Sequence, residues 1–224
     1  MAESGNAESR AAVVTSHGDA IAAAGDASRR ALQAKHEARE VTLGASRPAI
    51  RSCALAIRAI HRDDFDAARE HIADAQARLA EAAAATAAHP DVRSTGPLAD
   101  AQKEFAEANL TLAFVAGGSL PTAEELGVPV ASYLNGMAEA ASELRRQVLD
   151  LLRAGDSARA EELFATMDDV YAVLVTVDYP DAVTGGLRRT TDALRAVLER
   201  TRGDVTNAVI AARLQAAVES TESR

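Results

Sequence analysis

The sequence LGVPVASYLNGMAEAASELRRQVLDLLRAGD, residues 126–156, decides the fold class of this 224-residue chain. Pro129 suits the first turn of a helix, because a proline there removes no helical hydrogen bond. Beyond it, apolar residues recur at helical spacing in one stripe, made of Leu134, Met137, Ala141, Leu144, Val148 and Leu151. The helix is expected to end near Arg153 at the turn A-G-D, where Asp156 or Ser157 caps the next helix. The stretch therefore predicts two consecutive helices.

Helical spacing recurs through most of the chain and predicts further helices at residues 31–61, 63–87, 98–115, 157–177 and 187–218. One short helical turn is expected between Pro121 and Pro129. The sequence contains no alternating strand pattern and no hairpin turn signal. We therefore predict an all-α fold, an antiparallel bundle of about six to seven helices joined by short turns.

Apolar residues recur only weakly at helical spacing in the first 26 residues, which sets the N-terminal limit of the predicted domain. Residues 1–26 are expected to form a flexible or weakly helical extension, and residues 27–220 a single domain. Gly44 and Pro48 invite a kink or a break in the first long helix. Gly203 is expected to interrupt the last helix, and residues 178–186 read as a loop.

The composition supports an all-α protein and restricts its partners. Apolar residues make up 48% of the chain, aromatic residues only 3%, and alanine, the best helix former, dominates. The net charge of -9 repels nucleic acid unless basic residues gather locally or metal ions intervene. The lone Cys53 forms no internal disulfide and is expected to be a buried small residue. With no apolar run of ~18 residues, a cytoplasmic protein without membrane contact is expected.

Two pairs of glutamates are the candidate functional residues. Glu104 and Glu107 are three residues apart, and Glu139 and Glu143 are four apart, so each pair shares one side of a helix. Four carboxylates without an accompanying histidine suit Mg²⁺ or Mn²⁺ better than iron or zinc. The alternative is a solvated polar face on which Arg145 and Arg146 act as counter-ions, and spacing alone leaves both interpretations open.

Several stretches, taken in order, resemble the translin family, which includes translin and translin-associated factor X. They are AKHEARE at 34–40, AIRAIHR at 56–62, AQKEFAEA at 101–108, the first part of the opening stretch at 126–146, and LRRTTDAL at 187–194. The resemblance covers about residues 30–210. It implies a translin-like fold of about seven helices that assembles into a hollow octamer enclosing nucleic acid.

The resemblance also implies a function. The factor X branch is an endoribonuclease whose acidic residues bind Mg²⁺ inside the shell and cut single-stranded RNA, whereas the translin branch only binds. Glu104, Glu107 and Glu143 match the acidic set of the catalytic branch, and Glu139 stands where the family usually has Asp. Asn135 stands where an apolar residue is usual. The resemblance thus implies that the four glutamates are metal ligands and catalytic residues facing an enclosed lumen.

Basic residues of the last helix are the candidates for binding single-stranded RNA or DNA. Guanidinium groups match phosphate geometry, and the candidates are Arg188, Arg189, Arg195 and Arg200, with His61 as a further contact. The alternative is that these arginines pair with Asp192 and Glu199, and that His61 lies near Asp63 and Asp64 at a helix end. Two other functions stay open: a translin-type protein that binds without cutting, and a structural helical protein that binds partner helices.

Overall fold

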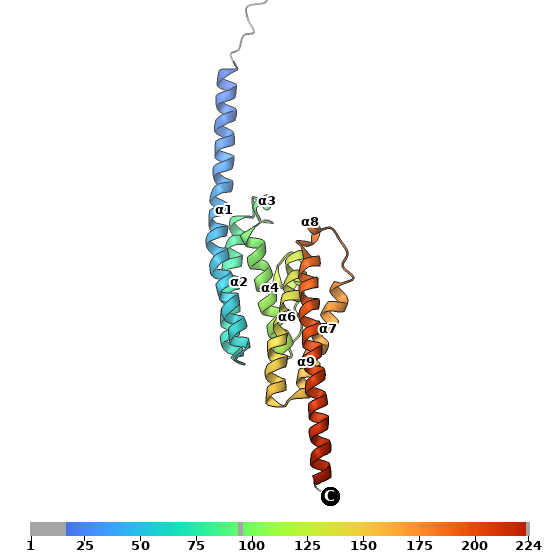
Figure 1. The fold of residues 1–224 in the computed structure, drawn as a ribbon. Helices are drawn as coiled ribbons and strands as arrows, with labels where there is room; N and C mark the ends of the chain where they lie inside the picture. The colour runs from blue at the N-terminus through green and yellow to red at the C-terminus, as the bar shows by residue number, and fades with distance from the viewer. Residues whose placement is uncertain (1–16, 94–95, 223–224) are drawn as a thin grey trace, which may run out of the picture.

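The computed structural model describes residues 17–93 and 96–222, and within them it contains nine α-helices and no β-strand (Figure 1). The all-α fold class is confirmed. The helices are α1 (Gly18–Ile60), α2 (Phe65–Ala85), α3 (Pro90–Arg93), α4 (Pro97–Ala116), α5 (Ala123–Leu126), α6 (Val130–Ala154), α7 (Ser157–Leu174), α8 (Asp181–Thr184) and α9 (Leu187–Glu222). Most of the predicted N-terminal extension, residues 1–16, lies outside the described residues.

The six long helices pack in two groups that meet at α4 and α6 (Figure 1). Helix α1 packs along α2 and α4, while α6 contacts α4, α7 and α9. The N-terminal half of α1 and the C-terminal part of α9 extend beyond the bundle at opposite ends (Figure 1). The central pair, α4 and α6, is therefore in contact with both groups.

Helices α4 and α6 run in the same direction, because the connection at residues 117–129 carries the chain back to the end where α4 began (Figure 1). The hydroxyl of Ser132 donates a hydrogen bond to the carbonyl of Ala99. One turn further along both helices, Gly136 lies against Lys103 and Glu107. The parallel arrangement places the acidic residues of α4 beside those of α6.

The predicted helix ends are largely confirmed. The side chains of Asp64 and Asp156 accept hydrogen bonds from the backbone N–H groups of Ala67 and Arg159, as N-caps do. Gly117 and Gly155 end α4 and α6 in the left-handed conformation, with φ of 75° and 84°. These short polar and glycine residues therefore fix where the long helices begin and end.

Two expectations about helix interruptions are wrong: a break at Gly44 and Pro48, and an interruption of the last helix at Gly203. Helix α1 begins at Gly18 and continues through Gly44 and Pro48 to Ile60. A proline removes one hydrogen bond, and packing of the neighbouring buried residues of α1 against α2 and α4 outweighs that loss. Gly203 lies inside a continuous α9, and the predicted loop 178–186 contains the single turn α8.

Small side chains dominate the core between α1, α2, α4 and α6. Ala49, Cys53, Ala56 and Ala106 are fully buried there, around the ring of Phe105. The prediction that Cys53 is a buried small residue is confirmed. Its thiol is kept protonated, because burial, together with the charges of Glu104 and Glu107, raises the pKa of Cys53 to about 12. None of the helices described is both long and apolar enough to span a bilayer.

Candidate metal centre

Three of the predicted glutamates come together between α4 and α6. Glu104 and Glu107 project from successive turns of α4, and Glu139 projects from α6. Each offers a carboxylate oxygen, and these three oxygens lie within 4.8 Å of one another. Three carboxylates gathered in this way form a set of hard oxygen ligands, which we name the carboxylate cluster.

Gly136 allows the two helices to approach closely enough to form the carboxylate cluster. A Cβ atom at this position would lie 2.7 Å from the carbonyl oxygen of Lys103 and 2.9 Å from the backbone nitrogen of Glu107. Only a residue without a side chain fits between such backbones. Glu139, one turn beyond Gly136, is thereby brought against α4, where its side chain is 33% exposed and pairs with Lys103.

Glu107 is the buried member of the cluster, with 7% of its surface exposed. Desolvation and the nearby charges of Glu104, Glu139 and Glu143 raise the pKa of Glu107 to about 9. Its carboxyl group therefore carries a proton at neutral pH when no cation is bound. A divalent cation would offset the repulsion among these groups, so the donor set fits Mg²⁺ or Mn²⁺.

Lys103 contacts the carboxylate cluster, and the sequence analysis did not predict this contact. Its Nζ lies 2.5 Å from a carboxylate oxygen of Glu139 and 3.3 Å from one of Glu104. Burial opposes the charging of this amine, but the hydrogen bonds and charges of Glu139 and Glu104 outweigh it and raise the pKa of Lys103. Because an isolated KE pair carries no signal for a second helix, only the fold reveals the contact with Glu139.

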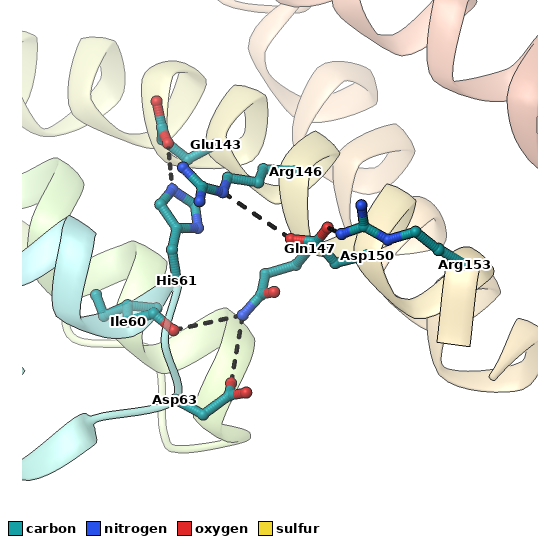
Figure 2. Close-up of polar contacts among 8 residues, drawn as sticks. All are labelled: Ile60, His61, Asp63, Glu143, Arg146, Gln147, Asp150 and Arg153. Atoms are coloured by element: carbon teal, nitrogen blue, oxygen red, sulfur yellow. Dashed lines mark hydrogen bonds and ion pairs between the residues drawn. The ribbon is translucent and has the colours of Figure 1, made fainter. Parts of the chain in front are cut away.

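Glu143 lies outside this group of three and is paired with His61 (Figure 2). The Nε2 atom of His61 is 2.7 Å from a carboxylate oxygen of Glu143, and the two side chains are 5% and 39% exposed. The alternative that placed His61 beside Asp63 and Asp64 missed this contact with α6. The His61 side chain is thus a buried link between the end of α1 and α6.

The arginines of α6 are not counter-ions of the glutamate pair. Arg145 pairs with Asp204 of α9 at 2.8 Å and donates a hydrogen bond to Thr201. Arg146 pairs with Asp150 at 3.9 Å (Figure 2). The interpretation of Glu139 and Glu143 as a face neutralised by Arg145 and Arg146 is therefore wrong.

The four candidate arginines of α9 are exposed and do not form one group. Arg189 lines a cavity of about 420 Å³ together with Lys103, Asn135 and Glu139. Arg188 and Arg195 line a different cavity, and Arg200 lines neither of the two. Glu199, one of the acids considered as a partner, pairs with Arg202. Arg189 is thus the arginine that the fold brings to the carboxylate cluster.

Asn135, also missed as a functional residue, holds the start of α9 beside this cavity. Its amide nitrogen donates hydrogen bonds to the carbonyls of Ala131 and Thr184, at 2.9 and 2.8 Å. Its amide oxygen accepts one from the hydroxyl of Thr190, at 2.6 Å. A buried amide needs such partners. The hydrogen bond to Thr190 also holds the first turn of α9, which carries Arg189, against α6.

The fold and this site define a class of protein: an all-α bundle that gathers carboxylates between two parallel helices. A scan against models of known protein families gives no match. The chain is 33% identical over 176 residues to the uncharacterized protein MJ0175 of Methanocaldococcus jannaschii, a match that covers 78% of each chain. Because the chain is also 30% identical to AfC3PO over 83% of its length, it belongs to the translin/C3PO family, in agreement with the resemblance in its sequence, and the match is consistent with an archaeal-type branch.

Solved structures agree with this assignment. The AfC3PO structure with duplex RNA has a TM-score of 0.75 and 30% identity, covering 83% of this chain and 96% of that one. A second AfC3PO structure has a TM-score of 0.76 and 29% identity, covering 83% and 97%. The apo-NeC3PO structure, 18% identical with a TM-score of 0.72, covers 82% and 96% and supports the fold alone.

Proposed function

We propose that this chain is a cytoplasmic RNA-binding protein that cuts single-stranded RNA with the help of Mg²⁺ or Mn²⁺. The observation that carries the proposal is the carboxylate cluster of Glu104, Glu107 and Glu139, whose oxygens lie within 4.8 Å of one another. Two of these carboxylates, Glu104 and Glu139, are part exposed and Glu107 is buried, so the cluster is open to solvent through Glu104 and Glu139. The three residues are the proposed cation ligands.

The donor set favours hard divalent cations. All three ligands are carboxylates, and the group includes neither histidine nor cysteine, which zinc prefers. When bound, Mg²⁺ or Mn²⁺ supplies Lewis-acid chemistry, polarising a phosphate oxygen and making nearby water more acidic. Glu107 is protonated at neutral pH in the cation-free protein, and its proton must leave before it acts as a charged ligand.

Residues around the cluster supply the other parts of the chemistry. Glu143 lies outside the ligand group, is 39% exposed and is held by His61, which supports a proposed role for its carboxylate as the acceptor of a proton from an attacking water. Arg189 lines the same cavity as Glu139, and its guanidinium fork suits a phosphate of the RNA backbone. The chain thus offers a cation site, a proton acceptor and a phosphate contact within one region.

RNA binding is supported by the similarity to AfC3PO, a protein whose structure was solved with duplex RNA. The net charge of -9 is unfavourable for such a ligand, so cations and local arginines must provide the attraction. With few aromatic residues for base stacking, we expect sequence-tolerant binding through the backbone that weakens as salt rises. Single-stranded DNA would bind by the same contacts.

We further propose that the chain assembles into a closed shell, an octamer as the translin resemblance implies. In such a shell the part-exposed sides of Glu104 and Glu139 would face an enclosed lumen. This explains how residues on the polar side of the bundle meet a substrate. A single chain leaves that side open to bulk water.

The test is cleavage of labelled RNA. Single-stranded and duplex RNA are incubated with the protein in Mg²⁺, Mn²⁺ or EDTA, and the fragments are resolved on denaturing gels. We expect cleavage of single-stranded RNA only with a divalent cation, and its loss in Glu104→Gln and Glu107→Gln. Glu70→Gln, which removes an exposed glutamate of α2, is the matched control. Intact RNA in every cation would contradict the proposed nuclease.

A second function is favoured by one observation. The ammonium of Lys103 already pairs with Glu104 and Glu139 and offsets one of their two negative charges, which is compatible with a protein that binds RNA and never loads a cation. Such a protein would retain RNA in a filter-binding assay in EDTA and leave it uncut in Mn²⁺. The cleavage experiment therefore separates the two functions.

A further inference from the structure

The ammonium of Lys103 stands where a divalent cation would bind. It contacts Glu139 at 2.5 Å and Glu104 at 3.3 Å, and these are two of the three carboxylates of the cluster. Its side chain is 25% exposed, so the contact is not that of a surface lysine moving freely in solvent. A positive charge that holds two of the ligands competes directly with a cation that needs the same oxygens.

We propose that Lys103 is the built-in counter-ion of the carboxylate cluster and must leave Glu104 and Glu139 when a divalent cation binds. This inference rests on the proposed function, because it requires the cluster to be a cation site. In the cation-free protein the ammonium holds the two carboxylates together against their repulsion. In the loaded protein its place is taken by the cation, so Lys103 sets the cation concentration at which the site fills.

The structure provides a place for the displaced ammonium. Lys103 lines the cavity of about 420 Å³ that Asp100, Gln102 and Arg189 also line. Asp100, three residues before Lys103 on α4, offers its carboxylate to a lysine head group that turns away from Glu139, since residues three apart on a helix are neighbours and an ammonium donates up to three hydrogen bonds. Loading the site would thereby bring the Lys103 charge next to Arg189, on the side proposed to bind phosphate.

The first experiment measures cation affinity. Mn²⁺ binding to the full chain is followed by titration calorimetry for the unmodified protein and for Lys103→Met, which keeps the apolar stem and removes the charge. We expect the Kd for Mn²⁺ to fall by about tenfold or more in this variant. The chain contains one other lysine, Lys35, which pairs with Asp91 far from the cluster in the sequence. Lys35→Met changes the net charge equally and should leave the Kd unchanged.

The second experiment detects the displacement itself and needs no variant. The unmodified protein is treated briefly with an amine-acetylating reagent in EDTA or in Mn²⁺, and acetylation of each lysine is quantified by mass spectrometry. We expect Mn²⁺ to accelerate acetylation of Lys103 severalfold, while Lys35 reacts at the same rate in both. An unchanged Lys103 rate in a protein that binds Mn²⁺ would overturn the inference, even if Lys103→Met binds more tightly through its altered charge alone.

The outcomes distinguish the inference from the function on which it rests. Equal Mn²⁺ affinity in the unmodified protein and Lys103→Met overturns the counter-ion role but leaves the cation site intact. Absence of Mn²⁺ binding in both proteins overturns the cation site, and the inference with it. Tighter binding in Lys103→Met together with Mn²⁺-dependent acetylation of Lys103 supports both.

Discussion

The imidazole of His61, at the end of α1, lies 2.7 Å from the carboxylate of Glu143 on α6, 82 residues further along the chain (Figure 2). One turn along α6, the amide of Gln147 lies 3.4 Å from the Ile60 carbonyl and from the Asp63 carboxylate. These contacts connect the end of α1 to α6 on the side where α6 carries the acidic residues. The position of Glu143 relative to the carboxylate cluster therefore depends on α1.

Replacing His61 with alanine should loosen this connection. We expect His61→Ala to lower the free energy of unfolding by about 1–3 kcal/mol, because a buried side chain and a hydrogen bond to a carboxylate are lost together. Urea unfolding in EDTA measures the change. Arg62→Ala removes the exposed neighbouring side chain and should cost less than about 0.5 kcal/mol. Equal losses in the two variants would show that the His61 contact contributes nothing to stability.

Adding one methyl group at Gly136 should separate α4 from α6. The new Cβ would meet the Lys103 carbonyl at 2.7 Å, so Gly136→Ala should cost about 1–3 kcal/mol of stability and weaken Mn²⁺ binding. Gly203→Ala is the matched control, because it makes the same change in α9 where a Cβ meets nothing within 4 Å. It should stabilise the protein by about 0.5–1 kcal/mol through helix propensity. Thermal unfolding and calorimetry measure the two effects.

Local sequence signals predicted the helices and their ends, because caps such as Asp64 and stop signals such as Gly117 act within a few residues. Local sequence signals failed where packing between helices outweighs the conformational preference of a single residue. Pro48 costs one hydrogen bond, and the flanking buried residues of α1 keep the helix continuous. The start of α1 at Gly18 and the continuity of α9 at Gly203 have no strong local signal.

The candidate site was predicted only in part, because it too depends on packing between helices. Spacing paired Glu104 with Glu107, and the translin resemblance joined Glu139 to them, but neither gives the distance between two helices. No local sequence pattern marks the close helix approach at Gly136 or the contact of Lys103 with Glu139. Both the close approach and the contact depend on the parallel packing of α4 and α6. The connection at residues 117–129 is long enough to allow this packing, but its sequence does not predict it.

The stability of the cation-free protein should fall as pH rises, because of Glu107. Its folded-state pKa is raised to about 9, above the usual 4.5 of a glutamate, so the folded state binds a proton that the unfolded state releases. This contribution is fully present below pH 4.5 and is lost progressively up to about pH 9. Glu107→Gln removes the titration and should stabilise the protein in EDTA above neutral pH, by about 1–3 kcal/mol.

The measurement is urea unfolding in EDTA at a series of pH values between these limits. Glu70→Gln, at an exposed position of α2, should keep the pH dependence of the unmodified protein. Saturating Mn²⁺ should reduce the pH dependence of the unmodified protein, since a bound cation favours the charged carboxylate. A Glu107→Gln variant that follows the same pH profile as the unmodified protein would show that Glu107 is already ionised.

Shortening Glu139 should be tolerated, whereas removing its charge should not. The translin family usually has Asp at this position. Glu139→Asp keeps the carboxylate but moves it away from the Lys103 ammonium, which lies 2.5 Å from Glu139 in the unmodified protein. We expect Glu139→Asp to retain Mn²⁺ binding and RNA cleavage. Glu139→Gln should lose affinity by at least the roughly 10- to 100-fold that an outer-shell partner costs. Calorimetry and the cleavage assay test both, and equal behaviour of the two variants would remove Glu139 from the ligand set.

The outer part of α9 should contribute to the proposed assembly. Ile210, Leu214 and Val218 are spaced by four residues on one side of the helix and are 50%, 63% and 56% exposed in the single chain. Burial of such a side chain against another copy contributes about 1.5–3 kcal/mol. Leu214→Glu should therefore lower the mass of the assembly measured by light scattering. Gln215→Glu adds the same charge one residue away, off this apolar stripe, and should leave the mass unchanged. An unchanged mass in Leu214→Glu would place the contacts between copies elsewhere on the bundle.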